Sequence, residues 1–385
     1  MINIVHCVTD EKFAKNIVTT FEFLADRCHS NYVYIESSKP KKLLYIKDNA
    51  SIEHLKIDEL MSRLQQGKYD VLFLHSLRSM PLNHIPLIPL QVKVVWLAWG
   101  FDIYYRVGAR PLVEVPNVYL PETKKLMKPT MSEIFTKTGK RLYKMFIQDR
   151  IMRKAVARVD FFSGVFPEEF DMMRCNSFFR ARPIEYRYAS PSSNISLDLL
   201  NTEEPVMGMN ILVGNSGDPS NNHADIFKKM SKVELGDRKI IVPLNYGGTS
   251  CYRQRVKELG KHLWGNRFIA IESFMPYENY KSFISSCGFR IFGHERQQAI
   301  GNIRVAFRSG CKVFLSKSSI IYRHQAALGL KIYTIQDDIE NGGLLTLPTD
   351  KETRDNRMIA VIDDLSSKQI ERLNNMTDII FSEIK

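Results

Sequence analysis

The sequence contains few cysteines, and its six cysteines are scattered along 385 residues without a Cys-x-x-Cys pair. Paired spacing is what structural zinc sites and small disulfide frameworks need, so neither is expected. No uninterrupted apolar run has the length of a membrane-spanning helix. The nearest run, residues 85–99, is broken by prolines, by Gln91 and by Lys93. The N-terminus leads directly into a strand-like run without a basic leader, which predicts no signal peptide, a cytosolic protein and reduced thiols.

Three nucleotide-handling motifs are also missing. There is no Gly-x-Gly anywhere, which excludes the dinucleotide-binding fingerprint of nicotinamide dehydrogenases. There is no Gly-x-x-x-x-Gly-Lys-Ser/Thr run, which excludes a P-loop kinase. There is no Asp-x-Asp pair of the kind that holds a divalent ion on a nucleotide diphosphate. No metal site and no bound cofactor are therefore expected.

What the chain does contain is a soluble, globular composition, with 44% hydrophobic and 25% charged residues. Its length fits two domains of ordinary size. In the first half, apolar runs that read as buried strands alternate with helical patterns, which predicts a doubly wound sheet. The predicted strands are residues 2–8, 32–36, 43–46, 69–75, 92–98 and 159–163, the last of this half, and the predicted helices are 12–25 and 52–65.

A polar stretch rich in proline and serine, residues 180–204, is the predicted linker. The alternation then restarts and predicts a second doubly wound domain of five strands with four helices between them. We assign residues 1–200 to the first domain and 205–365 to the second. The predicted strands are 208–213, 238–244, 267–271, 289–293 and 312–315, and the helices are 218–231, 249–263, 276–287 and 300–309, followed by a final helix at 366–384.

The net charge of +12 indicates a phosphate-rich partner: nucleic acid, an anionic membrane surface or a phosphorylated small molecule. Much of it lies between residues 137 and 158, where eight basic residues stand against one acid, Asp149, and alternate with an apolar helical face. Such a helix can lie on anionic lipid or can be an ordinary half-buried helix. The residues predicted to meet the membrane or another lipid are Lys137, Lys140, Arg141, Lys144, Arg150, Arg153 and Lys154.

One stretch of the second half carries the clearest ligand signal. Residues 211–213 are apolar and run straight into Gly214-Asn215-Ser216-Gly217-Asp218, where a buried strand must end in a tight loop. A helix then begins near Pro219, with Ser216 or Asp218 available as its cap. Free N–H groups at the carboxyl end of a strand favour an anionic ligand. A tight connection without a ligand is the alternative.

A second strand, residues 289–293, is followed by a polar loop and another predicted helix. Arg296 in this loop offers a planar guanidinium to phosphate oxygens; the alternative is that Arg296 and Gln297 are ordinary surface loop residues. The amides from Gln298 to Asn302 would form an anion-binding helix start. Two such loops in one domain favour a site for a nucleotide diphosphate, held by glycine loops, helix N-termini and positive side chains in place of a cation. That is the metal-independent, two-domain way of transferring a sugar.

These stretches carry a family resemblance. The run from Ile211 to His223, the run Ile241-Val242-Pro243-Leu244 leading to Tyr246, and Arg296-Gln297-Gln298 with Gly301 resemble the bacterial TDP-4-acetamido-4,6-dideoxygalactose (Fuc4NAc):lipid II transferases of enterobacterial common antigen synthesis. In the first half, Trp99-Gly100-Phe101-Asp102 and the strand ending at His75 are similar to that family's Trp-Gly-x-Asp and strand-terminal histidine.

The resemblance implies a GT-B glycosyltransferase: two Rossmann-like domains facing a cleft, the acceptor domain first, the sugar-nucleotide domain second, and the C-terminal helix, residues 366–385, packing back on the first. It implies a TDP- or UDP-sugar donor and an undecaprenyl-diphosphate-linked saccharide as acceptor. It also implies a peripheral enzyme at the cytoplasmic face of the inner membrane. The residues that it assigns to the donor are Gly214, Asn215, Ser216, Asp218, Asn222, His223, Pro243, Tyr246, Arg296, Gln297, Gln298, Gly301 and Asn302.

Glycosyl transfer needs a group that takes the proton of the acceptor hydroxyl, or at least hydrogen-bonds it, as the diphosphate leaves. Asp102 follows a predicted strand and is our first candidate for this base; His75, at the end of the neighbouring strand, is the second. Asp102 could instead cap the helix that it precedes, and His75 could hydrogen-bond within its own loop. The alternative function is a non-catalytic binding protein for an anionic ligand, and nucleic-acid binding is the weaker rival.

Overall fold

The computed structural model describes residues 1–10, 13–37, 43–47, 49–104, 111–115, 117–127, 140–188, 195–273 and 283–384, the side chains of residues 140–146 excepted. The chain forms two compact units. Unit 1 comprises Met1–Glu114, Lys137–Ile195 and Asp364–Lys385, and unit 2 comprises Val115–Thr136 and Ser196–Asp363. A segment from the middle of the N-terminal half thus belongs to unit 2.

Unit 1 contains a parallel sheet of seven strands in the order β3-β2-β1-β4-β5-β6-β7. Its central strands are buried apolar runs, as expected for a sheet covered on both faces. The strands are β1 Ile2–Val8, β2 Cys28–Ile35, β3 Ile52–Leu55, β4 Val71–Leu74, β5 Lys93–Leu97, β6 Phe161–Ser163 and β7 Arg182–Pro183. The helices are α1 Ala14–Phe21, α2 Ile57–Gln65, α3 Gly100–Ile103, α6 Lys140–Ala157, α7 Glu168–Arg174 and α15 Ser366–Phe381.

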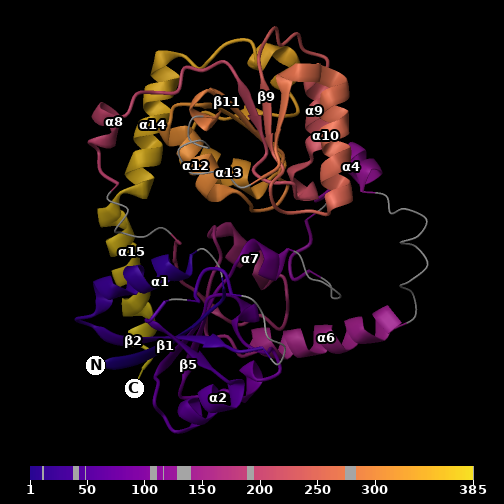
Figure 1. Ribbon diagram of the computed structural model, residues 1–385. Helices are drawn as coiled ribbons and strands as arrows, with labels where there is room; N and C mark the ends of the chain where they lie inside the picture. Colours follow the sequence, from indigo (N-terminus) through magenta and orange to yellow (C-terminus); the bar gives the residue numbers. More distant parts are fainter. Residues whose placement is uncertain are drawn as a thin grey trace. The chain divides into compact units, whose positions relative to one another are not determined.

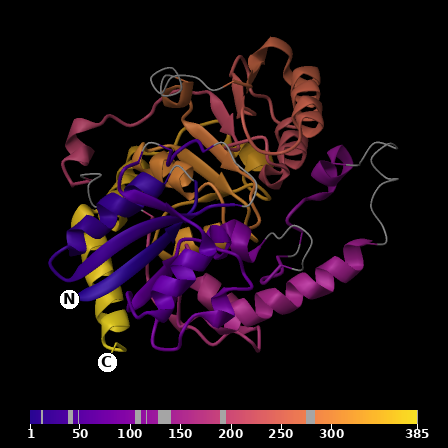
Figure 2. The same cartoon turned by 60° about the horizontal axis from the view of Figure 1, so that its bottom comes forward.

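Helix α15 lies on the same face of this sheet as α1. Its Leu373, Met376 and Ile380 are buried in one apolar cluster with Phe21 of α1 and Phe73 of β4. Figures 1 and 2 both show α15, in yellow, against the β1 and β2 side of the sheet, with the two chain ends near each other. The C-terminal helix therefore completes the core of the unit that the N-terminus begins.

Unit 2 contains a parallel sheet of six strands in the order β10-β9-β8-β11-β12-β13. The strands are β8 Ile211–Val213, β9 Ile240–Pro243, β10 Phe268–Ile271, β11 Phe289–Phe292, β12 Lys312–Leu315 and β13 Tyr333–Thr334. The helices are α4 Pro121–Leu126, α8 Leu199–Thr202, α9 His223–Met230, α10 Ser250–Trp264, α12 Ile300–Arg308, α13 Ile320–Ala327 and α14 Asp350–Asp364.

Helices cover both faces of the second sheet, because successive side chains of β8 are buried on opposite faces. Ile211 and Val213 pack with Phe227 of α9 and Val256 of α10. Leu212, between them, belongs to a separate cluster on the other face. Figure 1 shows α9 and α10 on one side of this sheet and α12, α13 and α14 on the other. Both units are therefore doubly wound.

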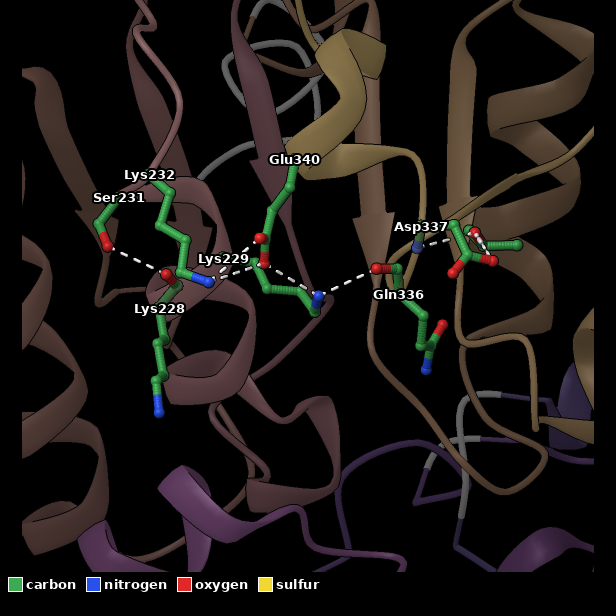
Figure 3. A network of polar contacts seen from close by, with 8 residues as sticks. Lys228, Lys229, Ser231, Lys232, Gln336, Asp337 and Glu340 are labelled. Atoms are coloured by element: carbon green, nitrogen blue, oxygen red, sulfur yellow. Dashed lines mark hydrogen bonds and ion pairs between the residues drawn. The ribbon is translucent and has the colours of Figure 1, made fainter.

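A polar network fixes the end of α9. Glu340, in the turn Ile339–Gly343, accepts from Lys229 and Lys232 at 3.1 Å each, and the Lys229 ammonium also donates to the Gln336 carbonyl (Figure 3). Lysines in the last turn of a helix also interact favourably with its dipole. The network anchors the helix that begins at the predicted donor loop.

Three predictions about elements were wrong. Residues 43–46 form no strand, because the Asp10 carboxylate accepts the backbone N–H groups of Leu44, Tyr45 and Ile46 that a strand would use. Residues 52–55 form the edge strand β3, not the start of a helix, because they pair with β2 from Tyr32–Ile52 to Ile35–Leu55.

The third error concerns the number of strands. Beyond 159–163, the two-residue strand β7 pairs with β6, inside the predicted linker. In unit 2, β13 adds a sixth strand beside β12. Strands of two residues are too short for an alternation pattern to reveal them. The predicted helix 276–287 lies for most of its length outside the described residues.

Candidate functional site

The strand order of unit 2 brings two loops together. Strands β8 and β11 are neighbours at the centre of the sheet, where the order reverses, and both strands point the same way. Open parallel sheets bind ligands at such a switch point, beyond the carboxyl ends of the strands. The loop that starts at Gly214 and the loop from Gly293 to Ala299 both begin there. The two predicted anion loops are therefore adjacent.

Gly214 makes the turn after β8 possible. Its φ is +72°, and a Cβ atom there would come within 2.6 Å of the Asn221 side-chain oxygen and 3.0 Å of His223 Nε2. The same Asn221 oxygen accepts the backbone N–H of Asn215 at 3.0 Å. A side chain at position 214 would thus displace the groups that hold the loop.

Hydrogen bonds join the loops after β8 and β11. The Ser220 hydroxyl lies 2.6 Å from the side-chain oxygen of Gln298 and also contacts Asp218, whose carboxylate accepts from the Ser220 N–H. The side-chain nitrogen of Asn222 donates to the Gly293 carbonyl at 2.7 Å. The two loops therefore form one connected surface.

The loop after β9 joins the same group. The Asn215 side chain donates to the Tyr246 hydroxyl at 3.1 Å, and the Gly217 N–H donates to the Tyr246 carbonyl at 2.7 Å. Tyr246 is half exposed, whereas Ser216 is buried beneath the loop. Pro243 is the buried last residue of β9. Residues predicted from three separate stretches are thus brought together.

Arg296 and helix α12 supply the positive side of this surface. Arg296 is partly exposed and donates to the Gln297 carbonyl at 3.1 Å. Ala299, with a φ of +59°, directs the chain into α12, whose first intrahelical bond goes from Ile303 to Ala299. The preceding N–H groups have no carbonyl within the helix. The space around Gly301 is open, and Asn302 is partly exposed.

Two predicted donor residues have other partners. Asn222 accepts the N–H of Leu120 at 2.8 Å through its side-chain oxygen, and its nitrogen bonds Val118 as well as Gly293. Asn222 therefore attaches the segment before α4 to the donor loops. His223 is fully buried, with Nδ1 3.2 Å from the Tyr252 hydroxyl, and burial lowers its pKa to about 4. It is neutral at physiological pH.

Two residues that the sequence did not single out lie in the loop after β11. His294 is fully buried, and neither of its ring nitrogens has a hydrogen-bond partner in the part of the chain that is described. Burial and then Arg296 hold its pKa well below the usual value. The Glu295 carboxylate accepts from the hydroxyls of Ser316 and Ser318. In the sequence, His294 and Glu295 are marked only by their position next to Arg296.

In unit 1, the two candidate bases lie at the carboxyl ends of β4 and β5. His75 is buried, with Nε2 3.1 Å from His6 Nδ1 and Nδ1 3.4 Å from the Tyr188 hydroxyl. Burial lowers its pKa to about 3, which makes it a weak proton acceptor at neutral pH.

Asp102 lies in α3 and is 2% exposed. One carboxylate oxygen accepts from the Ser76 hydroxyl at 2.8 Å, and the other accepts from the Trp99 N–H at 3.1 Å. Burial raises its pKa to about 6, against these hydrogen bonds. Asp102 does not precede a helix, as the capping alternative supposed; it is the third residue of α3, and its carboxylate accepts the N–H of Trp99, the residue before that helix.

The predicted basic helix is α6, which begins at Lys140; Lys137 lies outside the described residues, as do the side chains of Lys140, Arg141 and Lys144. Farther along, Arg150, Arg153 and Lys154 are exposed, and so is Ile147 at 44%. A cavity of about 460 Å³ lies beside this part of the helix. Its lining includes Leu112, Val113, Asp149, Arg153, Met172 and Phe178.

The sequence model of one known family matches more than half of this chain. That family is described as 4-alpha-L-fucosyltransferase, glycosyl transferase group 56, and the match covers residues 132–369. The chain belongs to this family. It is therefore a glycosyltransferase, and the resemblance predicted from the sequence is confirmed.

Solved structures show the fold of this group 56 transferase. A glycosyltransferase from Rickettsia africae ESF-5 has a TM-score of 0.61 at 11% identity, with 98% of each chain covered. The lipopolysaccharide outer core galactosyltransferase WaaB has a TM-score of 0.58 at 10% identity, with 99% of each chain covered. Anabaena Alr3699/HepE, solved with UDP and glucose, has a TM-score of 0.55 at 10% identity, again over 99% of each chain. The predicted GT-B fold is confirmed.

Two further observations concern metal ligands and membrane-spanning helices. Among the described residues, no three His, Cys, Asp or Glu side chains are grouped as ligands for a metal ion. No helix within those residues is long and apolar enough to cross a membrane.

Proposed function

We propose that this transferase moves an acetamido-deoxy sugar from a TDP-linked donor, of the TDP-4-acetamido-4,6-dideoxygalactose kind, to a saccharide carried on undecaprenyl diphosphate. The product would enter a cell-surface polysaccharide such as enterobacterial common antigen. The observation that carries the proposal is the connected surface of the loops after β8, β9 and β11, with Arg296 and the start of α12 at its edge. Family membership and the UDP found in the HepE structure support it.

Negative charge grows on the diphosphate as its bond to the sugar breaks. The Arg296 guanidinium and the free N–H groups of α12 are positive groups fixed before the reaction, and such groups stabilise a departing anion at little reorganisation cost. The left-handed turn at Gly214 leaves room for the Asn221 side chain, which holds the backbone of the donor loop in place. We propose that these groups serve in place of a divalent cation.

The Arg296→Ala variant tests the donor site. Losing a charge-assisted hydrogen bond to phosphate should weaken TDP binding by about 1.5 to 3 kcal/mol, roughly 10- to 150-fold. Calorimetry with TDP on the folded variant measures this. Lys239→Ala is the matched control, because Lys239 is exposed next to the opposite, N-terminal end of β9.

Unchanged TDP affinity in Arg296→Ala would remove that side chain from the site. Binding and turnover of the wild-type protein should also be the same with and without EDTA. Loss of turnover in EDTA, restored by magnesium or manganese, would contradict the metal-independent mechanism.

We further propose that α6 attaches the enzyme to the cytoplasmic face of the membrane. Each Lys or Arg at an anionic surface contributes about 1 kcal/mol. The exposed Arg150, Arg153 and Lys154, next to the exposed Ile147, present positive charge together with an apolar side chain. Such attachment would confine the enzyme to the plane of its lipid-linked acceptor.

Vesicle sedimentation tests the membrane role of α6. The protein should sediment with vesicles containing phosphatidylglycerol at low salt, less at high salt, and hardly with neutral vesicles, because salt screens exposed charges. Arg150→Glu with Lys154→Glu should reduce sedimentation and leave TDP affinity intact. Lys239→Glu with Lys261→Glu makes the same charge change on exposed residues of unit 2. An equal loss in both double variants would attribute binding to net charge and not to α6.

A further inference from the structure

The turn after β4 in unit 1 is strained at Ser76. This residue has a φ of +138° and a ψ of 147°, a combination that is essentially confined to glycine. The other non-glycine residues with positive φ among those described have φ values of 53° to 59°, in the ordinary left-handed region. A strained serine persists only where surrounding groups hold it.

Asp102 is one of the groups that hold Ser76. Its carboxylate accepts from the Ser76 hydroxyl at 2.8 Å, and that hydroxyl oxygen accepts the N–H of Arg78 at 3.0 Å. The Ser79 hydroxyl donates to the Ser76 carbonyl at 2.7 Å. Through its other oxygen, Asp102 accepts the N–H of Trp99 in the loop after β5. One buried carboxylate therefore ties two neighbouring loops together.

The loops that Asp102 joins present an aromatic and cationic surface. The rings of Trp99 and Phe101 are nearly parallel, 4° apart, with centroids 6.3 Å from each other. The guanidinium of Arg78 lies 5.2 Å from the centre of the Phe101 ring. Tyr188 and Phe13 also pack on Trp99, with ring centroids 4.1 and 5.1 Å from the Trp99 centroid. Arg78 is exposed, and both Trp99 and Phe101 are partly exposed.

This surface has the chemistry of a sugar site. The apolar C–H face of a sugar ring packs well on an aromatic ring, and a guanidinium donates to hydroxyl or anionic oxygens of the same molecule. The surface lies at the carboxyl ends of β4 and β5, the edge where parallel sheets hold ligands. No other partly exposed aromatic pair with an adjacent arginine occurs in the carboxyl-end loops of these two strands, within the described residues.

We propose that Asp102 is a positioning residue, which holds Ser76 and Trp99 so that Arg78, Trp99 and Phe101 form the surface on which the acceptor saccharide lies. The inference rests on the proposed function, since it concerns the acceptor of that reaction. A general base must come within hydrogen-bond reach of the acceptor hydroxyl. Asp102 is 2% exposed, and both of its oxygens already have donors, so the geometry favours positioning over proton transfer.

The first test separates binding from chemistry in Asp102→Asn. Asparagine keeps an oxygen for the Trp99 N–H and an amide that can donate to Ser76, so the loops are weakened but not lost. With an undecaprenyl-diphosphate-linked saccharide and TDP-Fuc4NAc as substrates, we expect the acceptor KM to rise about tenfold or more. We expect kcat to fall less than about tenfold and TDP affinity to stay unchanged. Arg78→Ala should likewise raise the acceptor KM.

A matched pair at Ser76 tests the strain itself. Ser76→Ala and Ser76→Gly both lose the hydroxyl that Asp102 holds, but only glycine adopts this φ without cost. We expect Ser76→Ala to raise the acceptor KM by several-fold more than Ser76→Gly. In the Ser76→Gly background, Asp102→Asn should add less to the acceptor KM than it does in the wild-type protein. This pair remains informative if Asp102→Asn does not fold.

Two results would overturn the inference. A fall in kcat of about 10² to 10⁴ at saturating acceptor in Asp102→Asn, with Ser76→Ala behaving as wild type, would make Asp102 the proton acceptor. An unchanged acceptor KM in Arg78→Ala and in both Ser76 variants would remove the surface from the acceptor site. Failure of the proposed function looks different: the wild-type protein would then bind no TDP or would transfer no sugar to the lipid-linked saccharide.

Discussion

Replacing Gly214 by alanine is expected to lower the free energy of unfolding by about 2 to 5 kcal/mol and to abolish measurable TDP binding. The left-handed φ of +72° costs a residue with a Cβ about 1 to 2 kcal/mol. The Cβ would also come within 2.6 Å of the Asn221 oxygen, an overpacking that costs about 1 to 3 kcal/mol. Urea unfolding and calorimetry with TDP measure the two effects.

Gly236→Ala is the control for this substitution. Gly236 has a φ of +55°, similar to that of Gly214, but nothing lies within 4 Å of the position of its Cβ. Only the backbone strain is then introduced, away from the loops after β8 and β11. A loss of TDP affinity as large in Gly236→Ala as in Gly214→Ala would show that general destabilisation, not the shape of the donor loop, decides binding.

The second large effect concerns the buried carboxyl of Glu169, at the start of α7. Burial raises its pKa from 4.5 to about 7, although the Phe166 N–H donates to it at 3.0 Å. Between these two pH values the carboxyl of Glu169 keeps a proton in the folded protein that the unfolded chain releases, so the contribution of this group to stability falls as the pH rises from 4.5 through 7. The fall due to this group is about 3 kcal/mol, from the size of the pKa shift.

Glu169→Gln should remove that part of the pH dependence. The amide keeps an oxygen for the Phe166 N–H and cannot ionise, so the variant should gain stability relative to the wild type as the pH rises from 5 to 8. Urea unfolding midpoints at these two pH values give the comparison. Asp171→Asn, an exposed carboxyl of the same helix, should leave the pH dependence unchanged. An equal change in stability between pH 5 and 8 in the wild type and in Glu169→Gln contradicts the assignment.

Much of the fold could be predicted because its signals are local. Strand β1 has the predicted bounds, and β4, β5, β8, β9, β10 and β11 lie within their predicted ranges, since parallel strands buried on both faces are continuous apolar runs. The prediction failed where the pattern was short or ambiguous. Ile52 and Leu55 are spaced for either a helix or a strand edge, and pairing with β2 decided between them.

The donor loops were the part of the site that the sequence indicated most directly. A buried strand followed by Gly214 and a polar loop allows few structures other than a tight turn with exposed amides. The same stretch did not indicate the hydrogen-bond partners of Asn222, since Leu120 and Val118 lie about a hundred residues earlier in the chain. No local pattern records a hydrogen bond over that distance.

By itself the sequence determined two doubly wound sheets, the positions of the loops after β8 and β11, and membership of a glycosyltransferase family, because each depends on residues that are close in the chain. Only the tertiary structure decided that Val115–Thr136 belongs to unit 2 and that Asp102 is buried against Ser76. Both depend on hydrogen bonds between residues far apart in the chain, from Leu120 to Asn222 and from Ser76 to Asp102. From the sequence alone, a carboxylate at the end of a strand is a candidate general base. Its neighbours in the folded protein decide whether a substrate can contact it.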